Sequence, residues 1–301
     1  MRFWQSLARA GSAAVTGRRL RAPILGTVAL MGFACAGAPP PPSRLEDKAR
    51  LDVPIAICRK PLSPGDLGDG GAPGPDAYFS VVFPSFRSFG APLGAHDPDC
   101  VGETHGSGVQ GTPGPIAAAD AIIVPGEDVD VVWLRAFQPS ADRTSEGPLA
   151  LVRARPSEID VYAVGDYHGS PSHSRFTLAK LGSTRAVVAA DDGCADVKVG
   201  AECESTLTLY VVIGGKLAPA ATSPAERIRY GTKRNLGRLQ YRLTTDPPVF
   251  DKATMTVHEK LQVRDSGEED IRKAEGDRVF VLGADGRVAA QQDSLWSQVP
   301  Q

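Results

Sequence analysis

Short segments rich in β-branched and aromatic residues follow one another along most of this chain, with turn residues between them. Such segments are typical of strands, and the turn chemistry at Gly169–Pro171 and Gly214-Gly215 favours short connections. In 239–243 apolar and polar residues alternate, which puts the apolar side chains on one face of a strand. The pattern predicts antiparallel sheets with one wet face, in a β-sandwich or stacked meander. The expected strands are Val129–Ala136, Leu149–Ala154, Ile159–Gly165, Phe176–Leu181, Arg185–Ala190, Thr206–Ile213, Arg229–Thr245 and Thr254–Asp265.

The region before these strands is less regular, because long Gly/Pro-rich loops interrupt it. Leu51–Ile57 and Ala77–Phe83 have the composition of strands, and a loop of Gly, Pro and Asp separates them. Pro84–Gly114 is a second irregular stretch, in which we expect Phe86 and Phe89 to hold the loop against the core. Loops of this length are usually functional or disordered, so we expect binding in this region.

One short helix is expected near the C-terminus, over Gly267–Ala274. Ser266 can cap its first turn, Glu269 can complete a capping box, and Gly276 is well placed to end it. A closing hairpin should follow, with strands Arg278–Leu282 and Arg287–Ala290.

The folded region should be one domain. We expect a single mainly β domain over 51–301, with a division near residue 125 as the alternative. Trp296 is expected to pack the C-terminus onto the body of this domain.

The N-terminal residues have the features of an export signal. Residues 1–21 contain five arginines and no acidic residue, and Ala22–Ala34 is uncharged. As a helix, those 13 uncharged residues would span about 20 Å, short of a bilayer core of about 30 Å. We therefore interpret 1–35 as a signal peptide and 36–50, with its four consecutive prolines, as a spacer.

The end of this leader allows two cleavage sites. Gly32-Phe33-Ala34-Cys35 resembles the lipobox of bacterial lipoproteins, which implies a diacylglyceryl thioether on Cys35 and a tether to the membrane. Ordinary cleavage before Gly37 is the alternative. Either site predicts export to the bacterial envelope, because the leader as a whole is a secretory signal. For the lipidated form Ala36 is not the Asp that marks inner-membrane retention, which favours the outer membrane over the inner one; otherwise the chain is periplasmic.

Four cysteines remain beyond Cys35, and their even number favours two disulfides in an exported protein. Three pairings are possible, and we expect the local one, Cys58–Cys100 with Cys194–Cys203. No pair has the spacing of a zinc site or of a Cys-x-x-Cys redox motif.

The charge of the exported part argues against one class of partner. Removal of the first 34 residues takes away five arginines and no acid, which leaves 28 basic against 35 acidic residues. This acidic balance excludes a general nucleic-acid binder.

One basic stretch stands out in this acidic chain. It could meet the phosphates of an envelope glycolipid or an acidic partner protein, or it could be a solvated sheet face. Alternation would put Arg238 and Arg242 on the exposed face of one strand. The stretch comprises Arg227, Arg229, Lys233, Arg234, Arg238 and Arg242, with Tyr230 and Tyr241.

Three clusters could hold a metal ion, although none has a known motif spacing. Histidines with carboxylates suit zinc, and dense carboxylates suit calcium. The clusters are His96, Asp97, Asp99, Glu103 and His105; Asp166, Tyr167, His168 and His173; and Asp191, Asp192, Asp196, Glu202 and Glu204.

Two motif matches fail on their context. Gly106–Gly111 matches G-x-G-x-x-G, but Thr112–Pro115 bars the helix that a dinucleotide site needs. Ser107 lacks the Gly-x-Ser-x-Gly context of a hydrolase. We therefore assign no catalytic residue, no metal and no cofactor. The sequence predicts an exported, lipid-anchored envelope protein with a binding or structural role; a periplasmic hydrolase or metal-dependent enzyme using His105 or His168 is the alternative.

Overall fold

The computed structural model describes residues 56–68, 71–83, 86–91, 115–136, 144–198, 200–233, 237–283 and 285–300. All of them belong to one compact unit, Lys48–Gln301. Strands dominate these residues, and they comprise β1 (Cys58–Pro61), β2 (Ala121–Val124), β3 (Asp130–Leu134), β4 (Ser145–Arg155), β5 (Glu158–Gly169), β6 (Ser174–Leu181), β7 (Thr184–Asp191), β8 (Cys203–Ile213), β9 (Lys216–Lys233), β10 (Gly237–Thr245), β11 (Val249–Asp251), β12 (Thr254–Arg264), β13 (Asp270–Leu282) and β14 (Val288–Ala290). The helical elements are α1 (Pro75–Val82) and the 3-10 turns η2 (Pro64–Asp66), η3 (Ala118–Asp120) and η4 (Leu295–Gln298).

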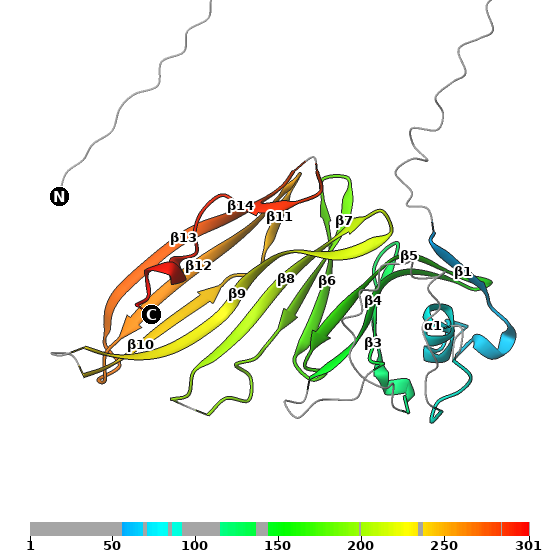
Figure 1. Ribbon diagram of the computed structural model, residues 1–301, viewed down its shortest axis with the longest axis horizontal. Coiled ribbons are helices and arrows are strands. Elements are labelled where there is room, and N and C mark those ends of the chain that lie inside the picture. The colour runs from blue at the N-terminus through cyan, green and yellow to red at the C-terminus, as the bar shows by residue number, and fades with distance from the viewer. Residues whose placement is uncertain are drawn as a thin grey trace, which may run out of the picture. The chain divides into compact units, whose positions relative to one another are not determined.

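The strands form successive layers that follow chain order. β2 to β5 make an antiparallel meander, and β1 adds to its β5 side. β6 to β9 make a second meander, and β9 continues into an outer sheet with β10, β12, β13 and β14. Figure 1 shows this sequence of layers, from α1 and β3–β5 on the right to β12 and β13 on the left. The prediction of a mainly β fold with antiparallel sheets is confirmed.

Three apolar cores fill the spaces between successive layers. One lies between α1 and the β2–β5 sheet, and a second lies between that sheet and β6–β9. The third packs β7 and β8 against β12 and β13. In β7, Val187 belongs to the second core and its neighbour Val188 to the third, so this strand is buried on both faces.

The hairpin between β8 and β9 follows the predicted turn chemistry. Ile213 pairs with Lys216, and the two residues between them, Gly214 and Gly215, have φ of 57° and 82°. Positive φ at both central positions is what a two-residue hairpin turn of the favoured hand requires, and glycine adopts it without strain.

The strand predicted at Ala77–Phe83 is wrong, because these residues lie in or directly after helix α1. A short apolar run does not distinguish a buried strand from a buried helix. The distinguishing signal was Pro75 at the first helical position with Asp76 beside it, both of which favour a helix start.

The helix predicted at Gly267–Ala274 is also wrong. Asp265 accepts hydrogen bonds from the backbone N–H groups of Gly267 (2.9 Å) and Glu269 (3.0 Å), and Glu268 has φ of 64°. These contacts close a tight turn, and β13 then pairs with β12. The residues that resembled a capping box therefore form a hairpin turn.

Other expectations near the ends of the domain are confirmed or lie outside the described residues. Phe86 and Phe89 pack on Phe79, with ring centroids 5.6 and 6.0 Å away. The closing hairpin exists as β13 and β14. Most of the strand expected at 51–57 lies outside the described residues, and the described strand, β1, begins at Cys58.

Replacement of Phe79 by alanine should lower the free energy of unfolding by about 3–5 kcal/mol. The fully buried ring of Phe79 anchors α1, and its removal leaves a cavity in the core. Phe89, whose side chain is 36% exposed, is the matched control, and its alanine variant should lose less than about 1 kcal/mol. Urea titration of both variants measures this difference. Equal losses would contradict the packing described.

Asp66 should make stability depend on pH in the acid range. Hydrogen bonds from the Ser63 hydroxyl (2.6 Å), the Ser63 backbone N–H (2.7 Å) and Lys60 (2.9 Å) lower the pKa of its carboxyl to about 2. Because the folded pKa lies below the unfolded one, the stabilisation is present above about pH 4 and is lost as the pH falls towards 2.

Asp66→Asn should therefore cost about 1–2 kcal/mol at neutral pH. The difference from the wild type should shrink below about pH 4 and vanish only below about pH 2. Urea unfolding measured across this pH range tests it, and a difference that is constant with pH would contradict the assignment.

Candidate functional site

The outer sheet presents a row of four side chains that crosses four strands. Arg229 on β9 pairs with Tyr241 on β10, Tyr241 pairs with Val263 on β12, and Val263 pairs with Arg272 on β13. Paired residues point to the same face of a sheet. Because neighbouring strands lie about 4.8 Å apart, the two arginines stand about 14 Å apart along the row, with an aromatic and an aliphatic side chain between them.

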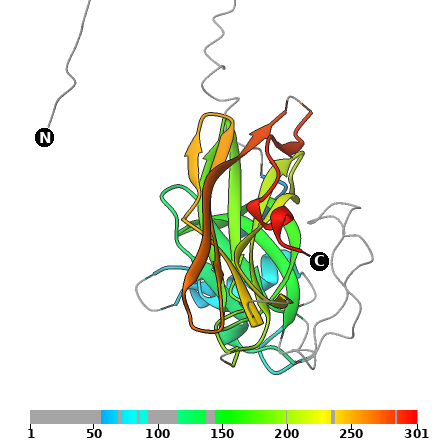
Figure 2. The same cartoon turned by 90° about the vertical axis from the view of Figure 1, so that its left-hand side faces the viewer.

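A groove of about 770 Å³ lies over this row. Leu239, Leu261 and Val263 form an apolar floor, and the C-terminal residues Val299 and Pro300 stand beside it. Figure 2 shows the outer sheet from its β13 side, with the C-terminal residues beside it. No acidic residue is among those that line the groove.

Two backbone features shape the groove. Gly231 has no side chain, and a Cβ there would meet Cε2 of Tyr241 at 3.1 Å, so the glycine leaves room above the floor. The pairing of β12 with β13 shifts register after Val263, so Ile271 is an extra residue in β13. Bulges redirect side chains, and Ile271 lines the groove while 43% exposed.

A buried carboxylate fixes the C-terminal wall of the groove. Glu259 is 1% exposed, and its Oε2 accepts hydrogen bonds from the Leu295 backbone N–H (2.6 Å) and the Ser294 hydroxyl (3.0 Å). Arg278 Nη1 lies 3.8 Å from the other oxygen. The Trp296 ring packs under the Arg227 guanidinium at 4.9 Å, which confirms that Trp296 docks the C-terminus.

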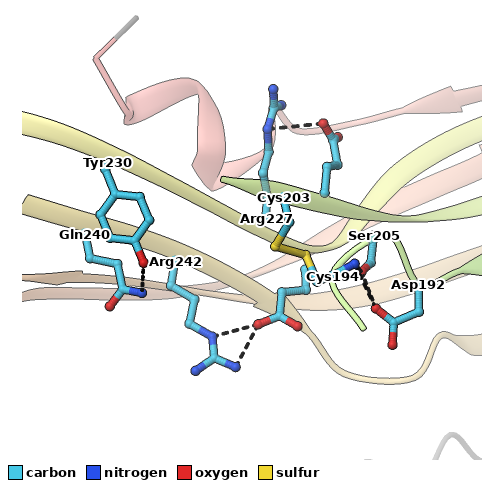
Figure 3. Close-up of a disulfide and its surroundings, with 10 residues drawn as sticks. Asp192, Cys194, Cys203, Ser205, Arg227, Tyr230, Gln240 and Arg242 are labelled. Atoms are coloured by element: carbon cyan, nitrogen blue, oxygen red, sulfur yellow. Dashed lines mark hydrogen bonds and ion pairs between the residues drawn. A yellow bond between two sulfur atoms is a disulfide. The ribbon is translucent and has the colours of Figure 1, made fainter. Parts of the chain in front are cut away.

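The opposite face of the same sheet is a ladder of paired polar groups (Figure 3). Arg242 bonds Glu226 at 2.7 and 2.8 Å, and Gln240 donates to the Tyr230 hydroxyl at 3.2 Å. Arg238 stacks on the Tyr230 ring at 4.0 Å and donates to the Gly200 carbonyl. Arg238 and Arg242 thus share a face, as predicted, but both already have partners within the protein.

The structure therefore divides the predicted basic stretch between two faces. Arg227, Arg229 and Tyr241 point towards the C-terminal segment, whereas Tyr230, Arg238 and Arg242 point away from it. Arg272 was missed by sequence reasoning, because its segment was interpreted as a helix. Residues 270–278 do not alternate apolar and polar side chains, so the sequence carries no strand signal at this position.

The Cys194–Cys203 disulfide lies beside strand β9 (Figure 3). Its Cα atoms are 5.1 Å apart, and it closes the end of the β7–β8 hairpin, as predicted. Cys203 pairs with Ile228 of β9, so the bridge and the groove share a strand. Cys58 is also disulfide-bonded, and its predicted partner Cys100 lies outside the described residues.

The carboxylates of the predicted calcium cluster have separate partners. Asp192 accepts from the Ser205 hydroxyl at 2.7 Å, and Glu202 accepts from the Tyr230 backbone N–H at 3.1 Å. Asp191, Asp196 and Glu204 instead contact Ser174, His173 and Arg227 respectively. Among the described residues, no group of three potential metal ligands comes together.

Of the two predicted histidine clusters, only the second lies among the described residues. His96, Asp97, Asp99, Glu103 and His105 all lie outside the described residues. In the second cluster His168 is exposed on β5, whereas Tyr167 is buried against Trp133 and Phe176 with ring centroids 4.9 Å from each. Burial raises the pKa of the Tyr167 hydroxyl, which donates to Ser174. Tyr167 is therefore a core residue.

A second hollow, of about 630 Å³, is mainly apolar. It lies between β6–β8 and the turn before β11, where Pro247, Pro248 and Phe250 line it. Its chemistry offers an apolar surface with few polar groups to orient a ligand.

No known family model matches this chain, and neither a curated protein nor a solved structure is significantly similar to it. Of the helices formed by the described residues, none has the length and apolar character needed to cross a membrane. The site must therefore be interpreted from its own chemistry.

Removal of the disulfide with Cys194→Ser and Cys203→Ser should lower the free energy of unfolding by about 2.7 kcal/mol, the chain-entropy value for a closed loop of about ten residues. Urea unfolding without reductant measures it. Ser205→Ala is the control in the same hairpin end: it keeps the disulfide and removes the hydrogen bonds that the Ser205 hydroxyl donates to Asp192 and accepts from the Cys194 N–H, at a cost of about 1–2 kcal/mol. An unchanged midpoint in the double variant would contradict a stabilising role for the bridge.

Proposed function

We propose that this chain is an exported, lipid-anchored protein of the bacterial envelope with a binding or structural role. The Cys194–Cys203 disulfide carries the proposal, because disulfides persist in oxidising compartments and are rare in the cytosol. The basic, acid-free leader and the lipobox-like residues before Cys35 support it independently.

The groove on the outer sheet supports binding as the role. Its lining offers two guanidinium groups and an apolar floor, which are groups that hold a ligand in place. Neither a histidine nor a carboxylate is among the residues that line it.

The proposed partners follow from charge and anchoring. The lipid on Cys35 would tether the chain to the membrane, and an envelope glycolipid or an acidic envelope protein would suit the positive groove. The acidic balance of the exported part disfavours nucleic acid.

The alternative, a periplasmic hydrolase or metal-dependent enzyme, depends on His105 or His168. His105 lies outside the described residues, and His168 is exposed on β5 opposite Glu146. Among the described residues, no observation favours this alternative over binding.

Cys35→Ser tests the anchor. In cells grown with a labelled fatty acid, the wild-type chain should carry the label and sediment with membranes, and the variant should lose both properties because it lacks the acylated thiol. Gly32→Leu is the matched variant: it introduces the residue usual in a lipobox and should increase labelling.

An unlabelled mature protein that begins at Gly37 would contradict lipidation but leave export standing. Free thiols at Cys194 and Cys203 in the chain recovered from cells would contradict an oxidising compartment.

A further inference from the structure

The groove over the Arg229–Arg272 row has unused positive charge. Within the part of the chain that the structure describes, neither arginine forms an ion pair with an acid; Arg272 donates to Gln298 Oε1 at 3.0 Å. The acids beside Arg229 at the start of β8 already have partners, since Glu202 accepts from the Tyr230 backbone N–H and Glu204 pairs with Arg227. A half-buried guanidinium such as that of Arg229 is well suited to an external anion.

The floor between the arginines is apolar, which favours a ligand with an apolar group. Leu239, Leu261 and Val263 lie there with the Tyr241 ring, and Ile271 adds an exposed aliphatic side chain at the rim. The three aliphatic floor residues are only 2–6% exposed, so the apolar surface that a ligand bound to the cations alone would leave against water is that of Ile271, 43% exposed, and of the half-buried Tyr241 ring. The groove volume also falls within the range of about 300–1,000 Å³ that is typical of sites for small molecules.

We infer that this groove binds a single-chain anionic lipid. The headgroup binds Arg229, the acyl chain lies on the apolar floor, and Arg272 adds a second positive charge at the other end of the row. The inference rests on the proposed envelope location, since a membrane is the source of such a lipid. It deepens that proposal by naming the ligand class and the residues that recognise it.

An acidic peptide fits this groove less well than a lipid. The floor is the face of a sheet, where the backbone groups of β10 and β12 are paired within the ladder. A peptide lying there would have its own N–H and C=O groups over aliphatic side chains, without partners. An acyl chain has no such groups.

The test uses isothermal titration calorimetry in detergent-free buffer on the purified full exported chain with Cys35→Ser, so that no attached acyl chain can occupy the groove. The probe is myristoyl lysophosphatidylglycerol below its micelle concentration. Three comparison ligands separate the sources of binding: the lysophosphatidylcholine with the same acyl chain, inorganic phosphate, and a hexaglutamate peptide. The anionic lysolipid should bind, and should bind at least about tenfold more tightly than each comparison ligand.

Variants assign the binding to the groove. Arg229→Gln should weaken the lysolipid about tenfold, and Arg272→Gln should weaken it by less, because its guanidinium is more exposed. Gly231→Val should also weaken it with no change in charge, since the added side chain meets Tyr241 and fills the groove. Arg242→Gln is the matched control, an arginine on the opposite face of the same sheet.

Tight binding of phosphate or hexaglutamate in place of the lipid would overturn the inference, and so would an equal effect of Arg242→Gln and Arg229→Gln. Circular dichroism of each variant must match the wild type; if Gly231→Val unfolds, the arginine variants decide the result.

The binding assay is independent of the Cys35 experiment. Loss of lysolipid binding with an anchored, exported chain defeats only this inference, whereas binding by a chain that is not exported defeats only the proposed function.

Discussion

The structure depends on one long strand, β9, that joins two layers of a single continuous sheet. The first part of β9 pairs with β8, its last eight residues pair with β10, and only a short stretch near Ile228 pairs with both. Two register shifts between β8 and β9 leave Ala220 and Ala225 as extra residues. Bulges of this kind bend a strand and increase its twist, which lets β9 pass from the central layer into the outer sheet.

The same strand explains where prolines are tolerated. Pro219 and Pro224 lie beside the two bulges, on the part of β9 that pairs with β8 alone. Proline cannot donate to a ladder, so it is found at edges and bulges. The prolines also interrupt the strand pattern of Lys216–Ile228, where the sequence analysis predicted no strand. The strand pattern is interrupted at these prolines, and in the structure the strand continues through them with a bend.

The candidate groove exists because the C-terminal segment covers only part of the outer sheet. The row of Leu243, Leu261 and Ala274 packs against Leu295 and Trp296, and Leu261 lies at the boundary, where it also lines the groove. The Arg229 row, one step further along the strands, is covered only in part: Val263 is 6% exposed, whereas Arg229 and Tyr241 are half-buried. Glu259 fixes this boundary, since Leu295 and Ser294 supply the hydrogen bonds to its Oε2, while its Oε1 forms no hydrogen bond and lies 3.8 Å from Arg278.

Local sequence determined several features without any tertiary information. Alternation placed Arg238 and Arg242 on one face, turn glycines marked the β8–β9 hairpin, and cysteine spacing indicated Cys194–Cys203. Each follows from backbone geometry or from spacing within a short segment. Only the tertiary structure decided that Asp270–Leu282 is a strand and that Arg229 and Arg272 end the same row. These depend on what a segment packs against and on register across four strands, and such partners lie far away in the sequence.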